Sequence, residues 1–162
     1  MTIKIGDKLP SVTLRQVTPA GPKEVTTESF FGGRKVVLFA VPGAFTPTCS
    51  QRHLPGYVER AADLKAKGID EVACVAVNDA AVLTAWGRDQ KSEGKVTLLA
   101  DGSGDFTRAL GLELDLSKMG LGIRSQRYSM LVEDGVVKSL SLEPAPAQVD
   151  TSGAEAMLKA LA

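Results

Sequence analysis

The stretch Val41-Pro42-Gly43-Ala44-Phe45-Thr46-Pro47-Thr48-Cys49 joins an apolar run at residues 36–40 to a helical pattern that begins near Cys49. A run that is short and β-branched predicts a buried strand. Thr46 followed by Pro47 is typical of a helix start, with the threonine as N-cap and the proline in the first helical position. Cys49 then lies in the first turn, where free N–H groups and the helix dipole favour the thiolate. The turn alone leaves two interpretations open, a reactive thiolate and a buried structural cysteine.

The residues of the loop before the cysteine predict a stiff backbone. Pro42 and Gly43 make a narrow turn with little side-chain bulk, and the two prolines of the loop each fix one backbone φ angle. Thr46 places a hydroxyl three residues before the sulfur. We expect this hydroxyl to cap the Cys49 N–H, a role that is compatible with a second contact to a ligand.

Residues 42–50, Pro-Gly-Ala-Phe-Thr-Pro-Thr-Cys-Ser, resemble the active-site signature of the peroxiredoxins, which are thiol peroxidases of the thioredoxin superfold. The Ala-Phe within this string and the Arg-His-Leu-Pro-Gly at 52–56 resemble the type II (five-type) branch. Residues 127–135, Arg-Tyr-Ser-Met-Leu-Val-Glu-Asp-Gly, resemble the second signature of the family. That resemblance implies that Arg127, and not the nearby Arg124, enters the site. It extends over nearly the whole chain.

Composition and charge narrow the class of protein. A chain of 162 residues with 44% hydrophobic and 23% charged residues is expected to form one globular domain, residues 1–162. Lys plus Arg and Asp plus Glu both number 19, so the charge predicts neither nucleic acid nor an anionic membrane as partner. No apolar run has the length of a membrane span and residues 1–7 lack a signal-peptide pattern, so we expect a cytoplasmic protein. Two cysteines and one histidine make a poor metal site, and no metal or cofactor is expected.

The rest of the chain alternates strand and helix patterns. The expected strands are an edge strand at 12–14 and its hairpin partner at 24–26, then 35–41, 72–77, 96–100, 128–132 and 136–142. The expected helices are a capped turn at 27–31, a helix from about 49 to 67 kinked at Pro55, one capped by Asn78-Asp79 and running to about 92, a short one ending near 111 and a last one from 154. Residues 112–124 show no period and contain two glycines, which predicts a long loop.

This order of elements predicts an α/β sandwich with a mixed central sheet. The resemblance adds the specific architecture, a thioredoxin-like three-layer sandwich with an N-terminal hairpin extension. Trp86 also matches the type II branch, and we interpret it as a packing residue.

Cys74 has two interpretations. It alternates with Val72 and Ala76 on a strand that is apolar on both faces, which is typical of a small core residue. The resemblance offers the other role, because in plant members of the branch a cysteine at this position is implicated in resolving the oxidised thiol. Animal members carry the resolving cysteine near the C-terminus, and the matching residues 149–152 contain no thiol here.

His53 lies four residues after Cys49, so its ring could neighbour the sulfur. A Cys–His pair suggests a cysteine hydrolase, although that chemistry needs an oxyanion hole and an orienting Asn or Asp. The other interpretation is a histidine that hydrogen-bonds helix or loop backbone.

Taken with the resemblance, these residues predict a thiol-dependent peroxidase for hydrogen peroxide and alkyl hydroperoxides. Cys49 attacks as thiolate and becomes sulfenic acid, Arg127 and Thr46 orient the peroxide with the Cys49 N–H, and Pro42 shields the sulfur. The resemblance implies a homodimer. Without a C-terminal cysteine, we expect glutathione, glutaredoxin or thioredoxin as external reductant, with Cys74 as a possible resolving residue.

Two alternatives remain at this point. A thiol–disulfide oxidoreductase of the same fold would need Cys-x-x-Cys, and the position three residues before Cys49 is Thr46. A non-enzymatic thioredoxin-fold interaction module would carry Cys49 only as a redox-sensitive residue, and the rate of peroxide consumption separates it from an enzyme.

Overall fold

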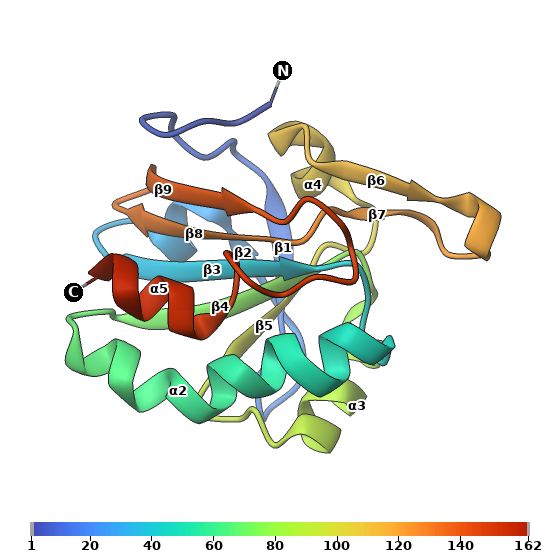
Figure 1. The fold of residues 1–162 in the computed structure, drawn as a ribbon, viewed down its shortest axis with the longest axis horizontal. Coiled ribbons are helices and arrows are strands. Elements are labelled where there is room, and N and C mark those ends of the chain that lie inside the picture. The colour runs from blue at the N-terminus through green and yellow to red at the C-terminus, as the bar shows by residue number, and fades with distance from the viewer. Residues whose placement is uncertain (1, 162) are drawn as a thin grey trace.

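The computed structural model describes residues 2–161 and contains a seven-stranded mixed sheet in the order β2-β1-β5-β4-β3-β8-β9 (Figure 1). Its strands are β1 (Thr13–Gln16), β2 (Lys23–Thr26), β3 (Lys35–Val41), β4 (Glu71–Ala76), β5 (Thr97–Ala100), β8 (Tyr128–Glu133) and β9 (Val136–Leu142). A separate antiparallel pair is formed by β6 (Glu113–Leu116) and β7 (Gly122–Ser125). The layered α/β prediction with a mixed central sheet is confirmed.

Five α-helices and two short helical turns connect these strands. The helices are α1 (Thr27–Phe31), α2 (Leu54–Ala66), α3 (Ala80–Gln90), α4 (Asp105–Leu110) and α5 (Ala154–Leu161), and the turns are the π-helical η1 (Cys49–His53) and the 3₁₀ turn η2 (Ser117–Met119). Within residues 2–161, no helix combines the length and apolar character needed to cross a membrane.

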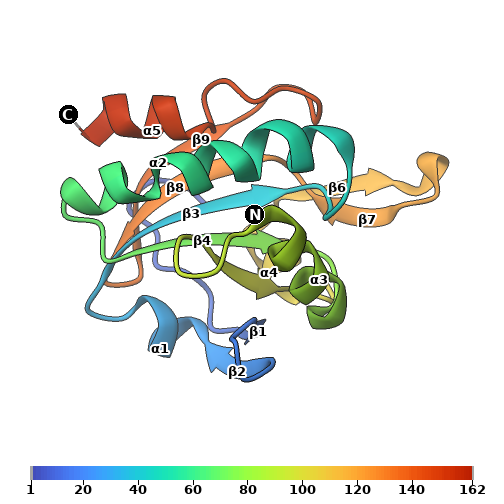
Figure 2. The ribbon, with the colours of Figure 1, turned by 90° about the horizontal axis from the view of Figure 1, so that it is seen from below.

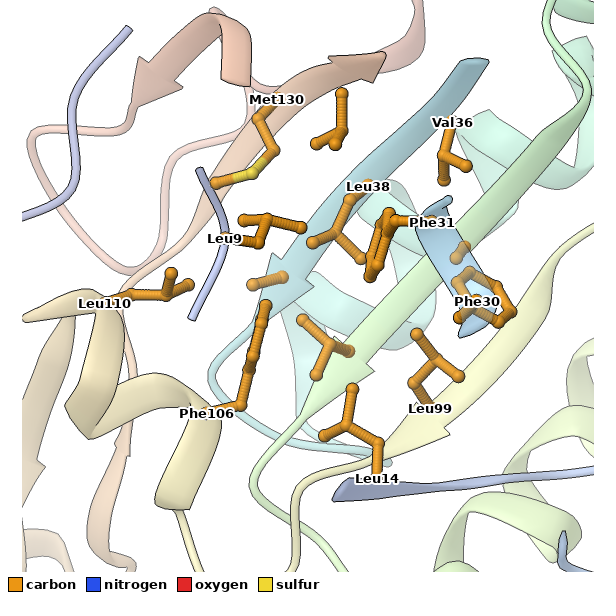
Figure 3. Close-up of a cluster of buried hydrophobic side chains, with 14 of the residues drawn as sticks. Leu9, Leu14, Phe30, Phe31, Val36, Leu38, Leu99, Phe106, Leu110 and Met130 are labelled. Carbon is orange, nitrogen blue, oxygen red and sulfur yellow. The ribbon is translucent and has the colours of Figure 1, made fainter. Parts of the chain in front are cut away.

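Apolar side chains pack the central strands on both faces, because β3 and β4 are almost wholly buried. One face is covered by α2, α3 and α5, and Figure 2 shows α2 and α5 side by side there with α1 on the opposite side. The other face is packed by α1, α4 and the N-terminal segment. Figure 3 shows Phe31 of α1 and Phe106 of α4 directed onto the strand that carries Leu38.

The register of the central strands brings two distant segments together. β3 runs parallel to β4 and antiparallel to β8, and Ala40 pairs with Tyr128 near the carboxyl end of β3. The residue before Tyr128 is Arg127, so it lies beside the point at which β3 ends and the loop to Cys49 begins. Sheet pairing therefore places the two sequence signatures at one end of the central strands.

The N-terminal hairpin forms as predicted, but the edge position was assigned wrongly. β1 pairs with β2 on one side and with β5 on the other, so β2 is the edge strand of the sheet. The strand at 12–14 was too short a pattern to reveal its second partner, which lies more than 80 residues away in the sequence at 99–100. The hairpin is thus an extension of the main sheet.

The prediction of a loop at residues 112–124 is wrong. This segment forms the β6–η2–β7 hairpin, which extends away from the main sheet in Figure 1. Leu114 and Leu116 alternate with acidic residues, a two-residue period that the sequence shows weakly because both leucines remain partly exposed. Gly120 and Gly122 adopt φ values of 76° and 69°, which lets the chain reverse between the strands.

The helix after the cysteine is also irregular in a way that sequence did not predict. The Leu54 N–H bonds to the Cys49 carbonyl, five residues back, so a π turn lies between the helical residues 47–48 and α2. α2 begins at Leu54 and Pro55 occupies its first turn, where a missing N–H is tolerated. The kink expected at Pro55 stays a prediction, and the irregularity that the structure does show, the π turn, precedes the proline.

Candidate functional site

Cys49 lies where β3, the following loop and the π turn η1 meet. Its side chain is fully buried, at 0% exposure. The Arg127 Nη2 donates a hydrogen bond to its sulfur at 3.1 Å. A permanent cation that donates to sulfur is the environment that stabilises a thiolate.

Arg127 is held rigidly although it precedes the strand β8. It is 2% exposed, and each nitrogen of its guanidinium has a partner. Besides the bond to sulfur, Nε donates to the Pro146 carbonyl at 2.9 Å and Nη1 meets His53 Nδ1 at 2.8 Å. Three of the five N–H donors of the planar fork are thus engaged, and one of them points at the sulfur.

His53 bonds to the arginine and to loop backbone. Arginine only donates, so His53 Nδ1 is the acceptor and Nε2 carries the proton that it donates to the Ser152 carbonyl at 3.0 Å. Burial and the neighbouring Arg127 lower the pKa of His53 from 6.5 to about 3, which keeps the ring neutral. The prediction of a bond to loop backbone is confirmed. Among residues 2–161 the histidine makes no hydrogen bond to Cys49, so the hydrolase interpretation lacks its pair.

The loop 42–46 forms a tight turn, in which the Thr46 N–H donates to the Gly43 carbonyl. Pro42, Gly43 and Ala44 are buried, whereas Phe45 is 53% exposed with a φ of 63°. The Thr46 hydroxyl donates to the Gly43 carbonyl at 2.6 Å. The prediction that this hydroxyl caps the Cys49 N–H is wrong, because the described hydrogen bond turns the hydroxyl toward the Gly43 carbonyl of its own tight turn.

Two side chains from the β4–α3 region support the loop. Asn78 Oδ1 accepts from the Ala44 N–H at 2.9 Å, so its predicted role as a helix cap is wrong. Asp79 alone caps α3, accepting from the Val82 N–H. Trp86 is buried, as its packing role predicts, and its Nε1 also donates to the Ser50 hydroxyl at 2.9 Å.

Arg124 approaches the loop from the β7 strand, a contact that the sequence did not indicate. Its Nη1 lies 3.5 Å from the Pro42 carbonyl and its Nε donates to the Leu121 carbonyl at 2.8 Å. A Cβ added at Gly43 would lie 2.7 Å from the same Nη1, so a glycine here lets the guanidinium approach. Unlike Arg127, Arg124 makes no contact with the sulfur among the described hydrogen bonds.

The segment after β9 contributes a buried carboxylate that sequence reasoning missed. Glu143 is 7% exposed, and its Oε2 accepts from the N–H and hydroxyl of Ser152 and from the Asp150 N–H. Burial alone would raise the pKa of Glu143, but these hydrogen bonds outweigh it and lower the pKa, so the group is ionised at neutral pH. Nothing in the irregular stretch Pro-Ala-Pro-Ala-Gln at 144–148 signals this arrangement.

Cys74 is a core residue of β4, as the first of its two interpretations predicts. It pairs with Phe39 of β3, is 1% exposed and is a free thiol like Cys49. Burial raises the pKa of Cys74, which keeps it protonated and weakly nucleophilic. Across residues 2–161, no group of three or more His, Cys, Asp or Glu side chains is arranged to hold a metal ion.

The chain is similar to proteins of a known family. The family model described as Redoxin matches residues 4–158. The chain is 57% identical over 165 residues to "Peroxiredoxin-2E-2, chloroplastic" of Oryza sativa subsp. japonica, covering 99% of this chain and 73% of that protein. It is 44% identical over 160 residues to "Peroxiredoxin-2B" of Arabidopsis thaliana, covering 98% of each. The location in the rice protein's name does not support the cytoplasmic expectation, which stays a prediction.

A solved structure shares the fold. The crystal structure of reduced Prx3 in complex with H2O2 from Vibrio vulnificus has a TM-score of 0.94 and 52% sequence identity, covering 99% of this chain and 100% of that chain. The thioredoxin-like architecture implied by the resemblance is confirmed by this match.

Proposed function

This chain belongs to the type II peroxiredoxins of the redoxin family and is a thiol peroxidase, and we propose that Cys49 is the residue that its peroxide substrate oxidises. The observation that carries the proposal is the 3.1 Å hydrogen bond from Arg127 Nη2 to the Cys49 sulfur. Cys74 makes no comparable contact with a cation among the described hydrogen bonds, and burial raises its pKa.

In the proposed reaction the Cys49 thiolate attacks the terminal oxygen of the peroxide. A sulfur–oxygen bond forms while the oxygen–oxygen bond breaks, and the electron pair of that bond leaves with the distal oxygen. The leaving hydroxide or alkoxide takes a proton to become water or alcohol. Sulfur is oxidised to sulfenic acid and the peroxide is reduced, so no metal or organic cofactor takes part in the balance.

Arg127 and Thr46 are proposed to hold the peroxide in line with the sulfur. The guanidinium stabilises the thiolate first and the charge on the leaving oxygen afterwards, since its donors are already aimed. The Thr46 hydroxyl donates to Gly43, so its remaining lone pairs can accept from the peroxide O–H. We assign the Cys49 N–H the same orienting role, and the buried Pro42 limits access of water to the oxidised sulfur.

We propose hydrogen peroxide and alkyl hydroperoxides as substrates. The Vibrio vulnificus Prx3 structure is a complex with hydrogen peroxide, and that protein is 52% identical to this chain. The chemistry of attack is the same for both substrates, because the atom that sulfur attacks carries only hydrogen and the other oxygen.

The proposed reductant is an external thiol, namely glutathione, glutaredoxin or thioredoxin. Cys74 lies within β4, hydrogen-bonded between β3 and β5, and its thiol stays protonated. A Cys49–Cys74 disulfide would need Cα atoms about 4.4–6.8 Å apart, and moving a mid-strand residue costs ladder hydrogen bonds. Attack on the Cys49 sulfenic acid by an external thiol requires no such rearrangement of the sheet.

We also propose a homodimer that covers the loop side of the molecule. Phe45 is 53% exposed beside the site, and the β6–β7 hairpin exposes Met119 and Ile123 at 71% and 47%. Apolar groups exposed in this way are typical of protein interfaces. Sedimentation of the reduced protein at roughly 10 μM should show a dimer, and a purely monomeric boundary would contradict this proposal.

Stopped-flow measurement of peroxide consumption tests the function. The wild-type protein and Cys74→Ser, each supplied with glutathione and glutaredoxin or with thioredoxin, should consume peroxide orders of magnitude faster than a free thiol, whereas Cys49→Ser should not. Near-normal turnover by Cys49→Ser would refute the assignment. Comparison of the two reducing systems on the wild-type protein identifies the physiological class of donor.

A further inference from the structure

We propose that Glu143 is a positioning residue for the peroxidase reaction, acting on Arg127 through Ser152 and His53; this inference rests on the catalytic role proposed for Arg127. The three contacts that link these residues join side chains that are all buried. Each link is a hydrogen bond, and each fixes the geometry of the next. The carboxylate itself touches neither the sulfur nor the arginine side chain among the described hydrogen bonds.

The hydrogen-bonded series Glu143–Ser152–His53–Arg127, called the relay below, ends at the Arg127 guanidinium. Arg127 presents Nη2 to the sulfur only while Nη1 and Nε keep their acceptors, because a rotation of the planar group moves all three nitrogens together. One acceptor is the Pro146 carbonyl and the other is His53 Nδ1. Loss of the acceptor at Nδ1 would remove half of the support and leave a buried donor unpaired.

His53 can accept from Arg127 only in one tautomer. Nδ1 must be unprotonated, so the proton must reside on Nε2, and a hydrogen bond from Nε2 selects that form. The acceptor for Nε2 is the Ser152 carbonyl, which also receives the Tyr57 hydroxyl at 2.7 Å. The place of this one carbonyl therefore decides both the tautomer and the tilt of the ring.

Glu143 fixes the place of that carbonyl. One carboxylate oxygen accepts three donors, the Asp150 N–H at 2.7 Å, the Ser152 N–H at 2.8 Å and the Ser152 hydroxyl at 2.5 Å. These bonds clamp a segment that has no regular secondary structure between β9 and α5. The Glu143 N–H also donates to the Arg127 carbonyl at 3.0 Å. This backbone hydrogen bond holds Glu143 and Arg127 next to each other.

The carboxylate is used here as an anion and not as half of an ion pair. No lysine, arginine or histidine forms a salt bridge with it among the described residues. Its charge is balanced by the three donors and, further away, by the Arg127 cation across the imidazole. An isosteric neutral amide should fill the same space but accept less strongly, which makes Glu143→Gln a selective probe of the relay.

The single histidine of the chain provides a readout that needs no assignment. Nitrogen-15 NMR of imidazole-labelled protein reports the two ring nitrogens of His53 alone. In the wild-type protein we expect one neutral ring with the proton on Nε2. In Glu143→Gln we expect the nitrogen shifts to move toward a mixture of tautomers, and the rate constant for peroxide to fall about tenfold, a change of roughly 1.4 kcal/mol in the barrier.

The matched control is Glu155→Gln, the same substitution on an exposed residue of α5 that pairs with Arg60. It should leave both the rate constant and the imidazole shifts at wild-type values. If Glu143→Gln loses rate while its imidazole shifts stay at wild-type values, or keeps its rate, the proposal is overturned. A wild-type protein that reacts no faster than a free thiol would instead refute the proposed function, and the NMR comparison would still decide the relay.

Two further variants guard against a Glu143→Gln protein that does not fold. Ser152→Ala removes only the hydroxyl donor and retains the carbonyl and N–H, so it should shift the imidazole resonances in the same direction by a smaller amount. In a His53→Ala background, either substitution should cause no additional loss of rate, because the relay is already broken. Additive losses in that background would overturn the proposal.

Discussion

Acidification should destabilise the protein through His53, and the effect can be isolated because the chain has one histidine. In the folded protein the pKa of His53 is lowered from 6.5 to about 3 by burial and by Arg127. Between these values the unfolded chain binds a proton that the folded protein excludes. The stabilisation is therefore complete above pH 6.5 and is lost as the pH falls toward 3.

The magnitude follows from the width of this window. Each pH unit below 6.5 costs about 1.36 kcal/mol of folding free energy until the folded pKa is reached. At pH 4.5, two units into the window, the loss attributable to His53 is on the order of 2.7 kcal/mol. That is a large share of the roughly 5–15 kcal/mol by which a typical domain is stable.

Urea unfolding of the wild-type protein and of His53→Gln at pH 7 and pH 4.5 measures this loss. Glutamine does not titrate, and the Asp and Glu side chains are common to both proteins, so the difference between the two pH dependences isolates the imidazole. The wild type should lose about 2.7 kcal/mol more than the variant. Equal losses in the two proteins would mean that folded His53 is protonated at pH 4.5 like a free imidazole. Its pKa would then not be lowered by burial and Arg127, which would contradict the account.

Three further predictions concern the site. Arg127→Lys should slow peroxide attack about 10²–10³-fold in stopped-flow measurements, because an ammonium cannot replace the fork of donors, and Arg124→Lys should slow it much less; equal losses would mean that both arginines act. Asn78→Ala should lower stability by about 1–3 kcal/mol in thermal unfolding, because the Ala44 N–H loses its acceptor, and an unchanged midpoint would contradict that contact. Cys74→Ser should lower stability by a similar ~1–3 kcal/mol, since a hydroxyl is buried without an assigned partner, yet keep its peroxide rate constant, and a large loss of rate would show that the core role is incomplete.

Local sequence patterns predicted most of the central sheet, because most of its strands are short apolar runs that can be recognised without their neighbours. β3 and β4 are continuous apolar runs, and the turn between β8 and β9 has Asp134 and Gly135 at positive φ, a conformation that suits a tight hairpin. The β6–β7 hairpin was missed because its leucines are only partly buried and its glycines read as loop. The helix starts at Pro47, as the Thr46-Pro47 pair predicts, whereas the π turn at Cys49–His53 was missed because it has no sequence signature.

The sequence predicted the site residues that belong to the two signatures. It did not predict the hydrogen-bond partners that lie far away in the sequence. Cys49 and Arg127 were named from two strings 78 positions apart, and the structure joins them by a hydrogen bond. Asn78 was interpreted as a local cap because the pattern cannot show that its amide reaches a loop 34 residues earlier. Glu143 lies in a stretch without periodicity, and only the fold brings its carboxylate behind the histidine.

The most direct test of the central claim is mass spectrometry of the reduced protein after one equivalent of hydrogen peroxide, with a sulfenic-acid trap such as dimedone and no added thiol. The proposed mechanism predicts a single trapped adduct on Cys49 while Cys74 remains an unmodified thiol. A trapped adduct on Cys74, or a Cys49–Cys74 disulfide as the dominant product that a thiol can reduce, would contradict it.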